Sequence, residues 1–165
     1  MYNELTQVDI DKMKREIEER IARRPALREA VKAAKELGDL SENDEYRSAR
    51  REKNSNDSRI RYLENMIRTA KIIDVSSNEG EVGLFDEVGI YYPEDDERRT
   101  IRIVTTLRND VFNDCISKES PVGKAILGHR VGDTVTVDTG KIKYPILIES
   151  IKKGSDDDSL PITSY

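Results

Sequence analysis

The chain has no Trp, only two Phe and one Cys among its 165 residues, and aromatic residues make up 5% of it. So few large apolar groups favour long solvated helices beside a small packed module over one large core. The single Cys115 excludes an internal disulfide, and we interpret it as a buried thiol in a reducing cytoplasm. No signal peptide and no long apolar run is present, so we predict a soluble cytoplasmic protein without a membrane partner.

Basic charge is not in excess, because 28 Lys and Arg face 33 Asp and Glu, for a net charge of -5. This balance argues against tight, sequence-independent binding to duplex nucleic acid, although a local basic patch is still allowed. The chain also has no phosphate-binding Gly loop, no Cys/His metal spacing and no nucleophile elbow. The only histidine, His129, follows a Gly and is interpreted as a surface-loop residue.

The composition changes near Asp74. Residues 1–74 contain one Gly and one Pro, whereas the rest of the chain contains eight Gly and four Pro with short runs of β-branched residues. We therefore predict an α+β protein of two domains: a helical one over residues 1–74 and a strand-rich one over 75–153. Residues 154–165 begin with a Gly-Ser-Asp-Asp-Asp-Ser run and are expected to form a disordered tail.

Two rows of residues in the first domain alternate spacings of three and four, which predicts an antiparallel coiled-coil hairpin. The rows are Ile10, Met13, Ile17, Arg20, Arg24, Leu27, Val31, Ala34 and Tyr46, Ala49, Lys53, Asn56, Ile60, Leu63, Ile67, Ala70. Folding about residue 40 brings Arg20 and Arg24 near Ile60 and Asn56, so the polar residues fall close together, and such a layer can fix register at a cost in stability. Pro25 predicts a kink or a break in the first helix.

The segment between the rows concentrates acidic residues. Gly38 is expected to end the first helix in a left-handed conformation. Asp39 or Ser41 could cap the second helix, with Glu42 or Asp44 answering three residues later. Four acids are followed by a group of bases: Asp39, Glu42, Asp44, Glu45 and then Arg47, Arg50, Arg51, Lys53. The carboxylates could hold Mg²⁺ and the guanidinium groups a phosphate backbone, but caps, macrodipole effects and i,i+4 pairs explain the same spacing.

The second domain reads as short strands with one short helix. The candidate strands are Gly80–Gly83, Glu87–Tyr92, Thr100–Thr105, Asp114–Ser117, Thr134–Asp138 and Ile142–Ile151, with a hairpin loop over 93–97. In residues 120–128, Ser120 is placed to cap the helix, Pro121 to occupy its first position and Gly128 to end it.

Residues 38–46 read Gly-Asp-Leu-Ser-Glu-Asn-Asp-Glu-Tyr. They closely resemble the tip motif of the Gre transcript-cleavage factors: Gly-Asp-Leu, any residue, Glu-Asn, any residue, Glu-Tyr. The resemblance continues at Arg24-Pro25, Ala49-Arg50, Arg59-Ile60, Leu63-Glu64, 70–74, Ile116-Ser117, Ser120-Pro121, 125–128 and 131–133. It covers nearly the whole chain except the last dozen residues.

The resemblance implies a coiled-coil hairpin and a globule like the FK506-binding proteins, with an antiparallel sheet and one short helix. It implies that the hairpin enters the secondary channel of bacterial RNA polymerase after backtracking. Asp39 and Glu42 match the two acids that help to hold a Mg²⁺ shared with the polymerase and not bound stably by the factor alone. The polymerase then cleaves its own transcript, so the factor is a cofactor, not an enzyme.

The resemblance also implies contacts with the nascent RNA 3′ end and with the polymerase. Arg50 matches a basic family position that contacts the RNA, and Arg47 and Arg51 are plausible helpers. Ser120 and Pro121 match the region that docks at the channel rim. We expect the factor to act as a monomer.

The chain departs from the family pattern at a few positions. Asp44 adds a charge at the tip, Thr105 and Asn113 stand where Gly is common, and the Leu5-Thr6 stretch lacks a following Gly. Because the tip carries several acids, an alternative hypothesis is an inhibitor with the Gre fold that blocks the channel without stimulating cleavage. A third alternative is a binding or folding module built on the FK506-like globule.

Overall fold

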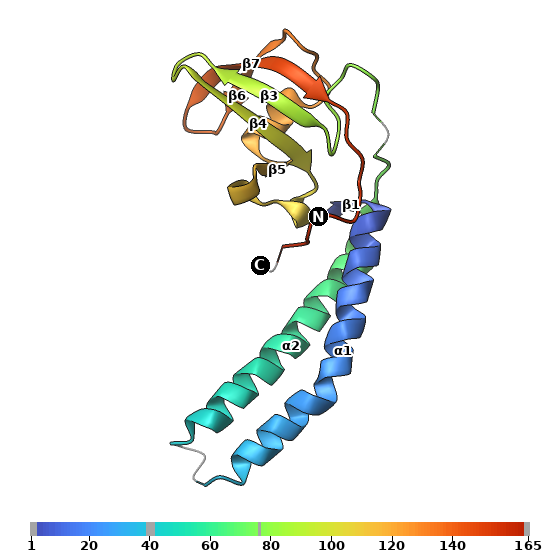
Figure 1. Ribbon diagram of the computed structural model, residues 1–165, viewed down its shortest axis with the longest axis vertical. Helices are drawn as coiled ribbons and strands as arrows, with labels where there is room; N and C mark the ends of the chain where they lie inside the picture. Colours follow the sequence, from blue (N-terminus) through green and yellow to red (C-terminus); the bar gives the residue numbers. More distant parts are fainter. Residues whose placement is uncertain (1–2, 39–41, 76, 164–165) are drawn as a thin grey trace. The chain divides into compact units, whose positions relative to one another are not determined.

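The computed structural model describes residues 3–38, 42–75 and 77–163 (Figure 1). They divide into two compact units. One is formed by Ile10–Lys71 with Asn3, and the other by residues 4–9 and 72–163. No helix within these ranges is long and apolar enough to cross a membrane.

The first unit is a hairpin of two helices, α1 (Gln7–Lys35) and α2 (Asp44–Thr69), of which the first turn of α1 belongs to the other unit. All residues of the two predicted rows are buried or half-buried, and Ile10, Met13, Ile60 and Leu63 are at most 4% exposed. The predicted antiparallel hairpin is therefore confirmed. α1 continues through Pro25 and changes direction part of the way along (Figure 1), so the helix is bent and not broken.

The polar layer of the hairpin is present and is larger than predicted. Asn56 donates to the carbonyl oxygen of Arg20 (2.9 Å) and accepts from its guanidinium (3.3 Å), whereas folding about residue 40 had placed Asn56 near Arg24. Arg24 instead pairs with Asp57, at 3.1 Å. The next level contains a pair that the spacing did not indicate, in which the buried Arg59 lies 3.0 Å from Glu16.

The second unit contains a curled five-stranded sheet in the order β5-β4-β3-β7-β6 (Figure 1). Its strands are β3 (Glu87–Tyr92), β4 (Glu97–Val104), β5 (Cys115–Ser117), β6 (Thr134–Asp138) and β7 (Lys143–Lys152). Neighbouring strands are antiparallel except β4 and β5, which are parallel. The short helix α3 (Pro121–Ile126) packs Ile126 into the apolar core of this sheet. The predicted α+β fold is confirmed.

Shorter elements complete the described chain. β1 (Asn3–Leu5) pairs with β2 (Ala70–Ile72), and two 3₁₀ turns, η1 (Thr106–Arg108) and η2 (Val111–Asn113), lie between β4 and β5. The predicted strand Gly80–Gly83 was wrong, because this segment forms only an isolated bridge between Glu81 and Arg130. A single bridge does not make a ladder.

The single cysteine is buried, and the C-terminal residues make contacts with the rest of the second unit. Cys115 is buried in β5, as expected, and burial raises the pKa of its thiol. Residues 154–163 are irregular but make fixed contacts, among them a hydrogen bond from Thr163 N–H to the carbonyl oxygen of Leu107, at 2.7 Å. The acidic composition of this segment did not indicate such contacts.

Candidate functional site at the hairpin tip

The candidate site lies where the chain passes from α1 to α2. α1 ends at Lys35 and is followed by a turn in which Glu36 and Leu37 donate to the carbonyl oxygens of Ala33 and Ala34. Gly38 then has a φ of +137°, which an L side chain rarely adopts, so a glycine is required at this position. The predicted site residue Asp39 lies outside the described residues, as does Ser41.

The N-cap of α2 is Asn43, and the prediction of Asp39 or Ser41 at this position was wrong. The Asn43 side chain accepts from the backbone N–H of Tyr46 (3.0 Å), and its amide donates to the carbonyl oxygen of Ala34 (2.7 Å). Asn43 therefore satisfies groups at the start of α2 and at the end of α1 together. The Asn amide supplies a separate acceptor and donor for these two bonds, whereas an ionised Asp carboxylate can only accept.

The carboxylate of Glu42 is available for chemistry. Glu42 precedes the cap, so its side chain lies outside the helix and is exposed. It has no hydrogen bond or ion pair to any residue that the structure describes. Capping therefore does not explain the acid at position 42.

The other two acids of the tip have a structural role. Asp44 and Glu45 occupy the first turn of α2, where negative charge interacts favourably with the helix macrodipole. Asp44 also lies 3.7 Å from Arg47, although its side chain is 96% exposed. An ion pair as exposed as this adds little stability.

The predicted RNA-binding arginines Arg47, Arg50 and Arg51 are all exposed on α2. Arg51 lines a groove along the hairpin together with Arg20 and Arg23 of α1. The sequence analysis missed Arg23, since it lies outside the buried rows and only the folded hairpin brings it beside Arg51. Clustered guanidinium groups form a surface that suits phosphate oxygens.

The predicted partner-binding residues Ser120 and Pro121 belong to the second unit. Ser120 caps α3 by accepting from the backbone N–H of Gly123 (3.0 Å), and Pro121 occupies the first helical position with its ring exposed. Both structural predictions for this helix are confirmed. The next residue, Val122, lines a hollow on the sheet together with Ile116 and Tyr144.

Phe112 is a further candidate contact residue of the second unit. Its side chain is 99% exposed at η2, beside Val111, which lines the same hollow. The hollow has a mixed lining of apolar and charged side chains, and an exposed aromatic side chain beside such a hollow is typical of a protein-binding surface. Sequence reasoning missed this surface, because Phe112 lies in a short 3₁₀ turn that no periodicity reveals.

Comparison with known proteins gives matches along nearly the whole chain. Residues 3–72 match the family model "Transcription elongation factor, N-terminal", and residues 76–153 match "Transcription elongation factor, GreA/GreB, C-term". The chain is 37% identical over 156 residues to the transcription elongation factor GreA of Streptococcus agalactiae, covering 90% of this chain and 94% of that protein.

Two further matches are a second GreA and a solved structure. The GreA of Mycoplasma capricolum is 38% identical over 151 residues, with 90% of this chain and 96% of that protein covered. Among solved structures, the transcription factor Gfh1 is 28% identical, with 93% of this chain and 99% of that chain covered and a TM-score of 0.46.

Proposed function

Since the chain belongs to the GreA/GreB family of transcription elongation factors, we propose that it stimulates the cleavage of backtracked nascent RNA by bacterial RNA polymerase. The hairpin is proposed to enter the secondary channel of the polymerase and bring its tip to the active centre. The observation that supports this most directly is Glu42. It is an exposed carboxylate of the tip motif, and the fold does not use it as a cap.

The acids of the tip fit a metal ion that is shared with a partner. Mg²⁺ prefers oxygen ligands in octahedral geometry and usually takes one or two carboxylates, so Asp39 and Glu42 would supply only part of its shell. The polymerase, the RNA phosphate and water would supply the rest. A magnesium ion held in this way promotes ionisation of bound water and neutralises charge on the phosphate.

The contribution of the chain itself is therefore to hold carboxylates at a fixed place. Asn43 joins the start of α2 to the end of α1, so the backbone directly after Glu42 is held in place. The factor is proposed to be a cofactor of the polymerase and not an enzyme, since Asp39 and Glu42 would supply only part of the metal shell.

The bases behind the tip and the surface of the second unit are proposed to provide the binding energy. Arg50, with Arg47 and Arg51, would contact phosphates of the extruded RNA, and Arg23 extends this set along the groove. Ser120 and Pro121 would dock on the polymerase at the channel rim.

The proposal is tested with stalled, backtracked polymerase complexes supplied with Mg²⁺, by following RNA length. The wild-type factor should shorten the transcript, and Asp39→Asn and Glu42→Gln should each lower the cleavage rate at least tenfold while binding is kept. Asp44→Asn is the matched control, because it removes the same charge from a neighbouring exposed acid.

Two other outcomes would contradict the proposal. Inhibition of elongation without shortening would indicate the channel-blocking inhibitor with the same fold. No effect on elongation or on RNA length would instead favour a binding or folding module.

A further inference from the structure

The C-terminal residues 153–163, here called the C-terminal strap, contact both segments through which the chain passes between its two units. These segments are residues 4–9, which end in the first turn of α1, and residues 72–81, which follow α2. All contacts described below lie within the second unit. The strap is an unexpected place for such contacts, because its composition predicts disorder.

The first connecting segment is held through a buried charge network. Thr6 and Asp9 cap the start of α1 reciprocally: the N–H of Thr6 donates to the Asp9 carboxylate (3.0 Å), and the N–H of Asp9 donates to the Thr6 hydroxyl (3.2 Å). The Asp9 carboxylate lies 2.8 Å from the guanidinium of Arg108 in η1. The side chains of Asp9 and Arg108 are both fully buried.

The strap completes this network. Asp156 lies 2.8 Å from the Arg108 guanidinium, with its side chain 5% exposed, and its other oxygen accepts from the Thr6 hydroxyl. One buried cation is therefore shared by an acid of the first connecting segment and an acid of the strap. Removing either acid would leave part of the buried Arg108 guanidinium without a polar partner, so the three side chains depend on one another.

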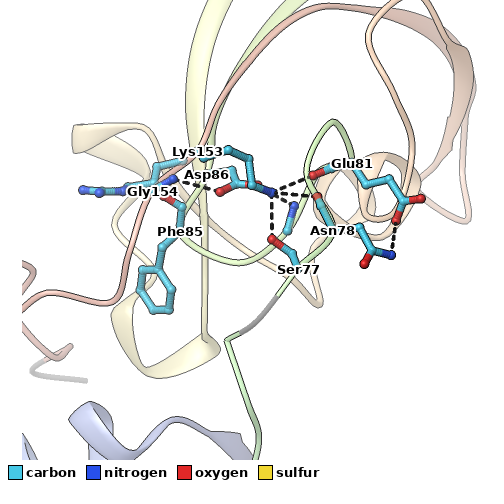
Figure 2. A network of polar contacts seen from close by, with 9 residues as sticks. Ser77, Asn78, Glu81, Phe85, Asp86, Lys153 and Gly154 are labelled. Atoms are coloured by element: carbon cyan, nitrogen blue, oxygen red, sulfur yellow. Dashed lines mark hydrogen bonds and ion pairs between the residues drawn. The ribbon is translucent and has the colours of Figure 1, made fainter.

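The second connecting segment is held by Lys153, as Figure 2 shows. The Lys153 ammonium donates to the Ser77 hydroxyl (2.7 Å) and to the carbonyl oxygens of Asn78 (3.2 Å) and Glu81 (2.9 Å). It also pairs with the buried Asp86 at 2.6 Å, and the Asp86 carboxylate accepts from the N–H of Gly154 (2.9 Å). The Lys153 side chain therefore holds three residues of the second connecting segment beside Asp86.

Packing adds to these polar contacts. Gly154 lies so close to the backbone of Phe85 that a Cβ would stand 1.9 Å from the Phe85 carbonyl oxygen, so only glycine fits. Further along, Leu160 packs against the buried cluster of Phe85, Val104 and Cys115, and Val75 of the second connecting segment packs against the same cluster.

We propose that the C-terminal strap is a positioning device that fastens both connecting segments and so limits the directions that the hairpin can take. The mechanical reason is that α1 is one continuous helix whose first turn lies in the second unit. Fixing Thr6 and Asp9 therefore restrains the direction in which α1 leaves its first turn, because the hydrogen-bonded helix continues from these residues without a break. Asp156, Arg108 and Lys153 are the positioning residues. A further consequence rests on the proposed function: a restrained hairpin would place the tip carboxylates accurately at the active centre of the polymerase, and cleavage depends on that placement.

The first test measures hairpin direction without any polymerase. Spin labels at Asn54→Cys and Thr136→Cys, both exposed positions on different units, are placed in a Cys115→Ser background, and their distance distribution is recorded. Asp156→Asn, Lys153→Met and a chain ending at Gly154 should each at least double the width of the distribution. Asp157→Asn is the matched control and should leave it unchanged, because the exposed Asp157 carboxylate accepts hydrogen bonds only from Ser159 of the strap itself among the described residues.

The second test separates positioning from binding. In cleavage assays the shortened chain and Asp156→Asn should lower the saturating cleavage rate at least fivefold while the half-saturating concentration changes less than twofold. An unaltered distance distribution in folded variants would overturn the proposal. If the wild-type factor does not stimulate cleavage, the proposed function fails, while the distance measurement still decides the role of the strap.

Hydrogen exchange of the wild-type protein provides a readout that needs no variant to fold. The amides of Thr6, Asp9, Gly154 and Thr163 should exchange together with those of the sheet, because all four donate to groups held in the second unit. Exchange of these amides at the rates of an unstructured chain would overturn the proposal.

Discussion

At the scale of single residues, two neighbours at the tip carry different tasks. Asn43 holds the hairpin closed through two hydrogen bonds, whereas Glu42 has no partner among the residues that the structure describes. Asn43→Ala should therefore lower the free energy of unfolding by about 1–2 kcal/mol through loss of the cap. Glu42→Ala should change it by less than about 0.5 kcal/mol, as is usual for an exposed side chain without contacts. Denaturant unfolding followed by circular dichroism measures both.

The pair is informative because the two variants should affect opposite properties. Asn43→Ala should affect stability first, and Glu42→Ala should affect cleavage with stability kept. If Glu42→Ala destabilises the protein as much as Asn43→Ala does, then Glu42 supports the tip structurally and its availability for a metal ion is lost.

The sequence indicated where the tip is but not how its residues divide these tasks. Asp, Ser and Asn are nearly equal as caps, and residues 39, 41, 43 and 44 all belong to these types. The choice depends on the carbonyl oxygen of Ala34, which only the folded hairpin brings to Asn43. The roles of Asp39 and Glu42 in cleavage were inferred from the resemblance to the Gre factors, since spacing alone fitted capping equally well.

At the scale of elements, the hairpin should lose stability in acid through the polar layer between α1 and α2. Partial burial alone would raise the pKa of Glu16, but hydrogen bonds and charge from Arg59 and Arg20 outweigh it and lower the pKa below its ordinary value. A carboxyl group with a lowered folded-state pKa stabilises the fold above its unfolded pKa of about 4.3, and this contribution is lost as pH falls through the folded value. The melting temperature should therefore fall between pH 6 and pH 3.

A substitution assigns this part of the pH dependence to Glu16. Glu16→Gln should lower the melting temperature at pH 6, where Arg59 loses its charged partner in a buried position, and should make the fall toward pH 3 smaller. Glu18→Gln on the exposed side of α1 is the control and should leave the curve close to that of the wild type. An equal acid dependence with and without Glu16 would show that the polar layer does not cause it.

The elements themselves were largely predictable, for reasons that also explain the failures. Alternating spacings of three and four gave both helices and their buried rows, because burial of one helix face requires that period. The spacing could not show the pair of Glu16 and Arg59, since each of them directly precedes a row residue and neither belongs to a row. The false strand at residues 80–83 contains two Gly and one Glu, which are depleted in strands, and it forms only one isolated bridge.

At the scale of the whole molecule, the two compact units should contribute separable quantities to cleavage. We assume that Ser120 and Pro121 dock the factor on the polymerase and that Glu42 acts at the active centre. Docking then sets the half-saturating concentration of the factor, and the tip sets the cleavage rate at saturation. Pro121→Glu keeps the fold, because an acid is well tolerated in the first turn of a helix, while it changes an exposed docking residue. It should raise the half-saturating concentration about tenfold without lowering the saturating rate.

The double variant tests whether these contributions are independent. Glu42→Gln should lower the saturating rate and leave the half-saturating concentration unchanged, so the double variant should show both defects at full size, since distant sites add in free energy. Titration of each variant against a fixed amount of backtracked complex gives both parameters. A half-saturating concentration that rises with Glu42→Gln alone would mean that the tip also provides binding energy. In that case the polymerase would hold the factor at both ends, and the division between a docking unit and a catalytic tip would not apply.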